Sequence, residues 1–104
     1  MHYDEPELKA ALKNFEKLLE EQPDDISAII PIKNFLRHFI RIRCKSMNIP
    51  TSEIMSILKH KKPNLHYHLK AMSSNDPTFY FLTNINMDYE KAMKRLEEIK
   101  KAIY

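Results

Sequence analysis

Residues 4–21 read DEPELKAALKNFEKLLEE, and their apolar side chains recur at the spacing of an α-helix. Signals for a helix start come first, because Asp4 is suited to the N-cap, Pro6 to the first turn and Glu7 to the capping-box position. The apolar stripe that follows consists of Leu8, Ala11, Leu12, Phe15, Leu18 and Leu19. This pattern predicts an amphipathic helix that ends near Glu21.

Similar stripes continue through most of the chain. They predict further helices over roughly 26–47, from 51 or 52 to 58, over 63–72 and from 86 or 88 to 103. We expect Thr51 or Ser52 to cap the short helix, and Ile40, Met47 and Met72 to face the interior. The central core residues are expected to be Leu12, Phe15, Phe35, Phe39, Ile54, Leu69 and Leu96.

The segment 73–85 is the least regular part of the sequence. Its run Phe79-Tyr80-Phe81 is compatible with a short strand, an extended segment or a helical turn capped by Asp76. The chain of 104 residues contains no glycine, which hairpin turns, bulges and phosphate-binding loops commonly require. The sequence therefore predicts an all-α fold, a single domain over 1–104 built as one compact bundle of about five helices.

Charge is distributed unevenly along the chain, although the formal total is only +3. Residues 4–25 hold eight acids and three lysines, a net charge of −5. Residues 33–70 hold nine bases and one acid, Glu53, a net charge of +8, and residues 76–104 are balanced with five of each. Such asymmetry indicates an anionic partner or an acidic surface of the same molecule, and it is not a signature of catalysis.

The basic face of the predicted second helix is the strongest candidate binding site. Lys33, Arg37, Arg41 and Lys45 are four residues apart, so a helix places them on one face, with Arg43 beside them. Phosphates along a nucleic acid would fit such a row, and so would an acidic protein surface. The alternative is a solvated helix face that the acidic first helix partly neutralises.

A second basic cluster lies in a helix-turn-helix-like pair predicted at residues 52–72. Its candidate contact residues are Lys59, Lys61, Lys62, Asn64, His68 and Lys70. Residues 64–72, NLHYHLKAM, resemble the recognition helix of winged helix-turn-helix repressors. Such repressors also need a two-stranded wing, for which residues 73–78 offer little room and no glycine.

No residue pattern indicates an enzyme. The closest histidine pair, His66 and His68, is two positions apart and would diverge on a helix, so no metal site is expected. We find no paired carboxylates in an apolar context, no nucleophile beside a base and no phosphate loop, so we expect neither catalysis nor a cofactor. With no apolar run of membrane-spanning length and no signal-peptide pattern, the expected location is the cytoplasm.

Five segments follow one another in an order that is typical of a known family. They are Ala11 to Leu19 with its Leu-Leu pair, Asn34 to Phe39, Thr51-Ser52-Glu53-Ile54 to Leu58, Lys62-Pro63, and Tyr89 to Ile103. In this order they resemble the C-terminal helical collar domain of the delta subunit of bacterial DNA polymerase III, the clamp-loader wrench. The chain departs from that family at Lys59, where the family commonly has glycine.

The resemblance implies a non-catalytic assembly domain of a DNA-replication clamp loader, in which collar domains pack side by side. Its partners would be protein subunits of a replication complex, with DNA as a further partner of the basic segment 33–70 and no membrane contact. The alternative is a helix-turn-helix transcriptional regulator that uses residues 52–72. The course of residues 73–85 bears on this choice: a β-hairpin favours the repressor, and a helix or an irregular link packed on the last helix favours the collar.

Overall fold

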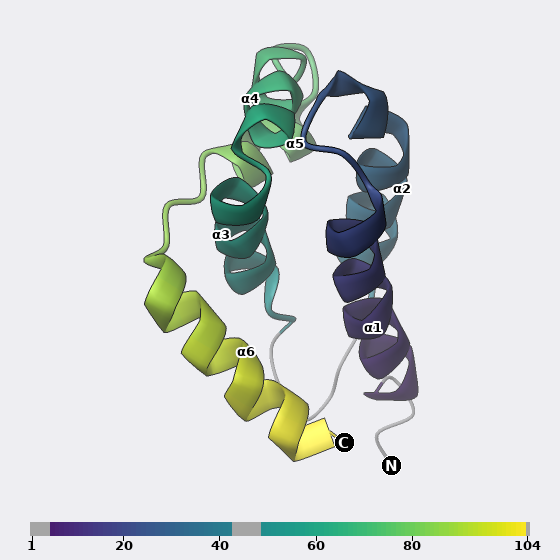
Figure 1. Ribbon diagram of the computed structural model, residues 1–104, viewed down its shortest axis with the longest axis vertical. Coiled ribbons are helices and arrows are strands. Elements are labelled where there is room, and N and C mark those ends of the chain that lie inside the picture. The colour runs from purple at the N-terminus through teal and green to yellow at the C-terminus, as the bar shows by residue number, and fades with distance from the viewer. Residues whose placement is uncertain (1–4, 43–48, 104) are drawn as a thin grey trace.

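The computed structural model describes residues 5–42 and 49–103 (Figure 1). Its elements are the α-helices α1 (Glu5–Glu21), α2 (Ile29–Phe39), α3 (Thr51–Lys61), α4 (Pro63–Ala71), α5 (Pro77–Thr83) and α6 (Tyr89–Ile103), and the 3-10 helix η1 (Ile26–Ala28). No strand occurs among the described residues, so the all-α prediction is confirmed. This part of the chain holds six α-helices in place of about five, because residues 77–83 form a helix of their own.

Two helix pairs face each other across the core (Figure 1). α1 and α2 lie side by side, run in opposite directions and are joined through η1, whereas α3 and α6 form the most extensive helix pair of the molecule. α4 closes one end of the bundle beside η1, and α5 contacts α3 and α4. Helices from the middle of the sequence thereby contact segments from both halves of the chain: α3 packs on α6, and α4 packs on η1.

Aspartates fix the starts of several helical segments. Asp25, Asp76 and Asp88 each accept a hydrogen bond of 2.9–3.1 Å from a backbone N–H two or three residues further along the chain. Each carboxylate thereby satisfies an N–H that has no partner within the first turn. The helical turn capped by Asp76, one of the three predictions for this segment, is therefore the correct one.

The core is a single cluster that includes all seven of the predicted central residues, each with an exposed fraction of 4% or less. Phe15, Phe35 and Phe39 form a row in which neighbouring ring centroids are 5.5 Å apart, and this row joins α1 to α2. Truncation of a buried phenylalanine to alanine typically costs about 3–5 kcal/mol. The aromatic row is therefore a major source of stability.

The second helix ends earlier than the sequence predicts. α2 stops at Phe39, and the N–H groups of Arg41 and Ile42 bond to carbonyl oxygens three residues back, at 3.1 and 3.2 Å. These tighter 3-10-type bonds close the helix. Ile40 consequently lies beyond the helix and is 38% exposed, so its predicted inward position is wrong. The predicted position of Met47 falls outside the described residues.

Two further predictions at helix ends are wrong. Met72 is exposed, because α4 ends at Ala71 and the buried Ser73 takes the inward position that follows. Thr51 and Ser52 do not cap α3, because the helix begins at Thr51 and both side chains already belong to its first turn. The predicted cap at Asp4 lies outside the described residues.

Candidate functional site

The first two residues of the predicted basic row contact an aromatic ring. Lys33 Nζ and Arg37 Cζ each lie 5.1 Å from the centroid of the Phe79 ring in α5. Phe79 is buried, so its ring joins the charged side of α2 to α5. A cation–π contact of this kind contributes about 0.5–1 kcal/mol at an exposed site. Part of the basic row is thus used for packing within the domain.

The predicted straight row of four bases is wrong for the described residues, because α2 ends before Arg41. Arg37 and Arg41 nevertheless stay together. They line a hollow of about 150 Å³, here called the arginine hollow, whose other lining residues are Ile40, Asp76, Thr78 and Phe79. Arg43 and Lys45 lie outside the described residues.

The second basic cluster contacts residues 22–25, here called the acidic turn, between α1 and η1. Asp24 accepts hydrogen bonds from Leu65 N at 2.8 Å and from Asn64 Nδ2 at 3.2 Å. Lys62 Nζ donates to the carbonyl oxygen of Gln22 at 2.8 Å. The turn therefore caps α4 from about 40 residues away in the sequence. Two predicted nucleic-acid contacts, Lys62 and Asn64, are occupied by groups of the same chain.

Acids of α1 face the junction of α3 and α4 as well. Lys61 and Lys62 line a hollow of about 320 Å³ together with Glu16 and Glu20. These carboxylates lie on the acidic first helix, which sequence analysis considered, as an alternative, for neutralising the bases of the second helix. Over the described residues, the structure thus separates the two predicted basic clusters: the bases of α2 pack on α5, and the bases at the end of α3 lie near α1 and the acidic turn.

The remaining candidates lie at the edge of this junction. Lys59 and Lys70 are exposed, and His68 is half-buried. Hydrogen bonds from Ser27 hold the pKa of Asp25 below its ordinary value, and the nearby imidazole of His68 lowers it further. His68 therefore lies near enough to Asp25 to act on its charge.

His66 lies inside the molecule, on the inner side of α4. Its side chain is 5% exposed, and no described residue forms a hydrogen bond with Nε2. Burial lowers the pKa of His66 to about 4, and the positive charges of Lys59 and Lys70 act in the same direction. The imidazole is therefore neutral at pH 7 and offers no positive charge to a phosphate.

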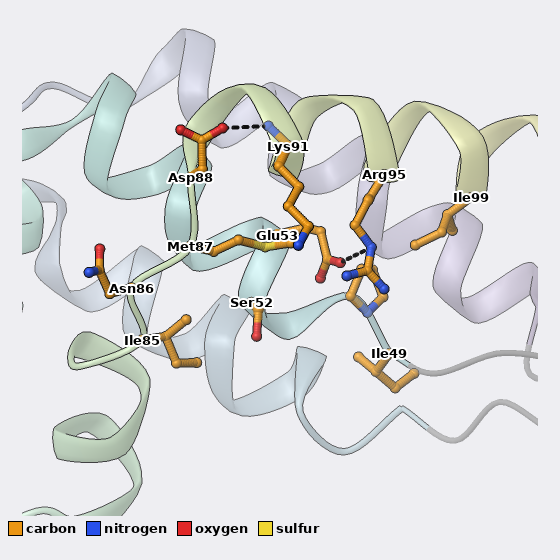
Figure 2. Close-up of a pocket in the computed structure, with 11 residues that line it drawn as sticks. Ile49, Ser52, Glu53, Ile85, Asn86, Met87, Asp88, Lys91, Arg95 and Ile99 are labelled. Atoms are coloured by element: carbon orange, nitrogen blue, oxygen red, sulfur yellow. Dashed lines mark hydrogen bonds and ion pairs between the residues drawn. The ribbon is translucent and has the colours of Figure 1, made fainter.

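A larger hollow of about 650 Å³, here called the α6 hollow, lies between the start of α3 and α6 (Figure 2). In it, Glu53 Oε2 lies 3.4 Å from Arg95 Nε, and the Glu53 side chain is nearly buried while Arg95 reaches it from the surface. Lys91 also lines the hollow. Sequence analysis did not single out this pair, although Glu53 is the lone acid among the nine bases of 33–70.

An apolar hollow of about 540 Å³ lies between α2, α3 and α5. Its lining residues are Ile40, Thr51, Ser52, Pro77, Thr78, Phe81, Leu82 and Ile85. Phe81 is 68% exposed, although it is a large apolar side chain. Within the aromatic run the three side chains differ: Phe79 is buried, and Tyr80 and Phe81 are exposed.

Comparisons of the chain with protein-family models, curated protein sequences and solved structures give no significant match. Within residues 5–42 and 49–103, no three histidine, cysteine, aspartate or glutamate side chains come together in a way that could hold a metal ion. None of the helices in those ranges has the length and apolar content needed to cross a bilayer. Functional inference therefore depends on the sequence resemblance and on the surfaces described above.

Proposed function

We propose that the chain is a non-catalytic assembly domain of a DNA-replication clamp loader and packs against neighbouring subunits as a collar domain does. The observation that carries the proposal is the helix over residues 77–83, which exposes Phe81 at an apolar hollow. Large apolar side chains exposed at a hollow are typical of surfaces that bind other proteins. The resemblance to the delta-subunit collar supports the clamp loader as the assembly, and the cytoplasm as its place of action.

Two features argue against the alternative, a winged helix-turn-helix regulator. α5 occupies the segment that follows α4, where such a regulator would have its two-stranded wing; it packs on α3 and α4, whereas the collar expectation is a segment packed on the last helix. Asp24 also occupies the N-terminus of α4, the end of a recognition helix that contacts base edges. A DNA reader built on this pair would first have to release the acidic turn, and the released carboxylate would then repel the phosphates.

The role in assembly is tested by mixing the purified chain with the other clamp-loader subunits of the same organism. We expect co-elution with them in size-exclusion chromatography. Replacement of Phe81 by aspartate should weaken the association, whereas replacement of Glu98, exposed on α6, by alanine should leave it unchanged. Failure of the wild-type chain to co-elute at micromolar concentrations would contradict the clamp-loader role.

Duplex DNA binding separates the two candidate functions. An assembly domain should bind duplex weakly and without sequence preference, with dissociation constants no tighter than about 10⁻⁶–10⁻⁴ M at physiological salt. A regulator should prefer one site over scrambled sequence by about 10³-fold or more. Selection from a random duplex library, followed by salt titration of the enriched sequence, distinguishes these outcomes. Enrichment of one sequence to that degree would replace the assembly proposal with the regulator.

A further inference from the structure

The three hollows of the candidate site adjoin one another, and together they are called the groove. The apolar hollow shares Ile40 and Thr78 with the arginine hollow at one end. At the other end it shares Ser52 and Ile85, both labelled in Figure 2, with the α6 hollow. The groove therefore runs from the end of α2, past the starts of α3 and α5, to α6.

The middle of this groove is apolar and partly open to water. Ile40 is 38% exposed and Phe81 is 68% exposed, and Leu82 closes the floor beneath them. Burial of apolar surface is favourable by about 25 cal/mol per Å². A ligand with bulky apolar side chains on one face would therefore gain most of its binding free energy here.

The two ends of the groove differ in charge. At the α6 end, Glu53 pairs with Arg95, and Asp88 and Lys91 add one charge of each sign. At the other end, Arg37 and Arg41 are both exposed, and Asp76, the one acid among the described residues that line the arginine hollow, offsets one of their two charges while it accepts hydrogen bonds from backbone N–H groups of α5. Among the described residues that line the groove, the excess charge is thus positive and lies next to the apolar floor.

We propose that this groove binds an acidic amphipathic helix of a partner protein, with its apolar face on Ile40 and Phe81 and a carboxylate against Arg37 and Arg41. Helices that dock in apolar grooves place side chains at positions i, i+3 or i+4, and i+7 on the floor. The positive end selects for acidic residues beside the apolar anchor and fixes the direction of the helix. This inference rests on the proposed role in protein assembly, and it adds the surface and the chemistry of the partner.

A protein partner fits this groove better than a nucleic acid. Single-stranded nucleic acids bind surfaces that alternate positive charge and aromatic rings along the path of the backbone. Here the excess positive charge lies at one end, none of the described residues that line the middle section is lysine or arginine, and the Phe79 ring beside Arg37 is buried. The groove offers one apolar section and one positive end, which match one amphipathic segment.

The test uses the full chain and two labelled synthetic peptides, measured by fluorescence anisotropy at low salt. The Glu peptide is an amphipathic helix with leucine on one face and glutamate on the other, and the Lys peptide has lysine in place of glutamate. We expect the Glu peptide to bind at least about tenfold more tightly, and salt to reduce this preference. Equal affinity for the two peptides, or tighter binding of oligothymidine than of the Glu peptide, would overturn the proposal.

Variants locate the binding site. Phe81→Ala and Arg41→Glu change exposed side chains, so both should fold, as circular dichroism would verify. Each should weaken binding of the Glu peptide about tenfold. The matched controls are Tyr80→Ala, an exposed aromatic residue of the same helix, and Lys70→Glu, an exposed base of α4; neither lines the groove. Loss of binding in the controls equal to that in the groove variants would contradict the proposal.

The groove proposal and the clamp-loader proposal can fail independently of each other. If the Glu peptide binds and Phe81→Ala weakens it, the groove is established even when the chain fails to co-elute with clamp-loader subunits. If the chain co-elutes with those subunits and the Glu peptide shows no preference over the Lys peptide, the clamp-loader role stands and the groove proposal is wrong.

Discussion

His66 differs from the basic residues around it because its side chain is buried. It stands in the most basic stretch of the sequence, yet its imidazole is buried and, among the described residues, its Nε2 is the sole buried side-chain polar atom without a hydrogen-bond partner. An unsatisfied buried polar atom costs about 1–3 kcal/mol. Burial disfavours the protonated imidazole, and the positive charges of Lys59 and Lys70 add to this effect, so the neutral form is favoured.

The lowered pKa of His66 predicts a loss of stability in weak acid. The folded value is about 4 and the ordinary value is 6.5, so between these limits the unfolded chain takes up a proton that the folded chain does not. The free energy of unfolding should fall as the pH drops through this window and should be unaffected by this group above it. Urea denaturation of wild type and of His66→Leu, at about pH 7.5 and about pH 5, measures the difference.

In the His66→Leu variant this part of the acid sensitivity should be absent, and the carboxyl groups common to both proteins serve as the internal control. An equal loss of unfolding free energy in the two proteins between these conditions would show that His66 titrates normally.

At the scale of elements, α4 depends on a contact from another part of the chain. Asp24 supplies the cap that the N-terminus of α4 lacks locally, since its preceding residue, Lys62, makes no side-chain capping bond. α5 shows the opposite case, because Asp76 caps it from the neighbouring position and burial of Phe79 holds it against the bundle. A strand-prone aromatic run thus becomes helical through its cap and one buried ring.

Replacement of Asp24 by alanine should therefore destabilise the protein by about 0.5–2 kcal/mol, because the Leu65 N–H loses its acceptor. Glu21→Ala is the matched control: it removes an exposed acid from the end of α1 and should change the unfolding free energy by less than about 0.5 kcal/mol. Chemical denaturation followed by circular dichroism gives both values. Equal effects of the two substitutions would show that only the loss of negative charge matters.

The helical spacing of apolar residues was enough to predict most helices and the core. The end of α2 and the groove depend on contacts between segments far apart in the sequence, so they could not be predicted. Leu12, Phe39 and Leu96 follow from spacing alone and are buried as expected. The end of α2 at Phe39 has no local marker, because the residues that follow it are compatible with a helix. The groove was equally hidden, since it requires segments near residues 40, 51 and 81 to meet.

At the scale of the whole molecule, the opposite charges of the two sequence segments are partly matched inside one domain. Glu16 and Glu20 face Lys61 and Lys62, and the acidic turn holds α4. Glu16 also pairs with Lys100 of α6, so the first helix binds to the last. The positive charge near the end of α2 remains for a partner, together with the exposed Lys59 and Lys70.

This distribution predicts the effect of reversing that charge. The double variant Arg37→Glu and Arg41→Glu should lose retention on a heparin column and lose binding of the Glu peptide. Its thermal stability should change little, by about 1 kcal/mol at most, because only the cation–π contact of Arg37 with Phe79 is removed. Lys94→Glu with Lys101→Glu, two exposed bases of α6, is the control with the same change in net charge.

If the control loses as much heparin retention as the arginine variant, the total charge matters and its position does not. If the arginine variant unfolds, the two guanidinium groups are structural.

The contact between the acidic turn and α4 also has a consequence for how the chain folds. The bond from Lys62 to Gln22 closes a loop of 40 residues, and the entropy of closing such a loop must be overcome before the bond contributes anything. The cap of α4 therefore forms only when the acidic turn and the start of α4 have come together. Folding of the two halves is coupled, and a fragment containing only α3 and α4 would lack the cap that defines its second helix.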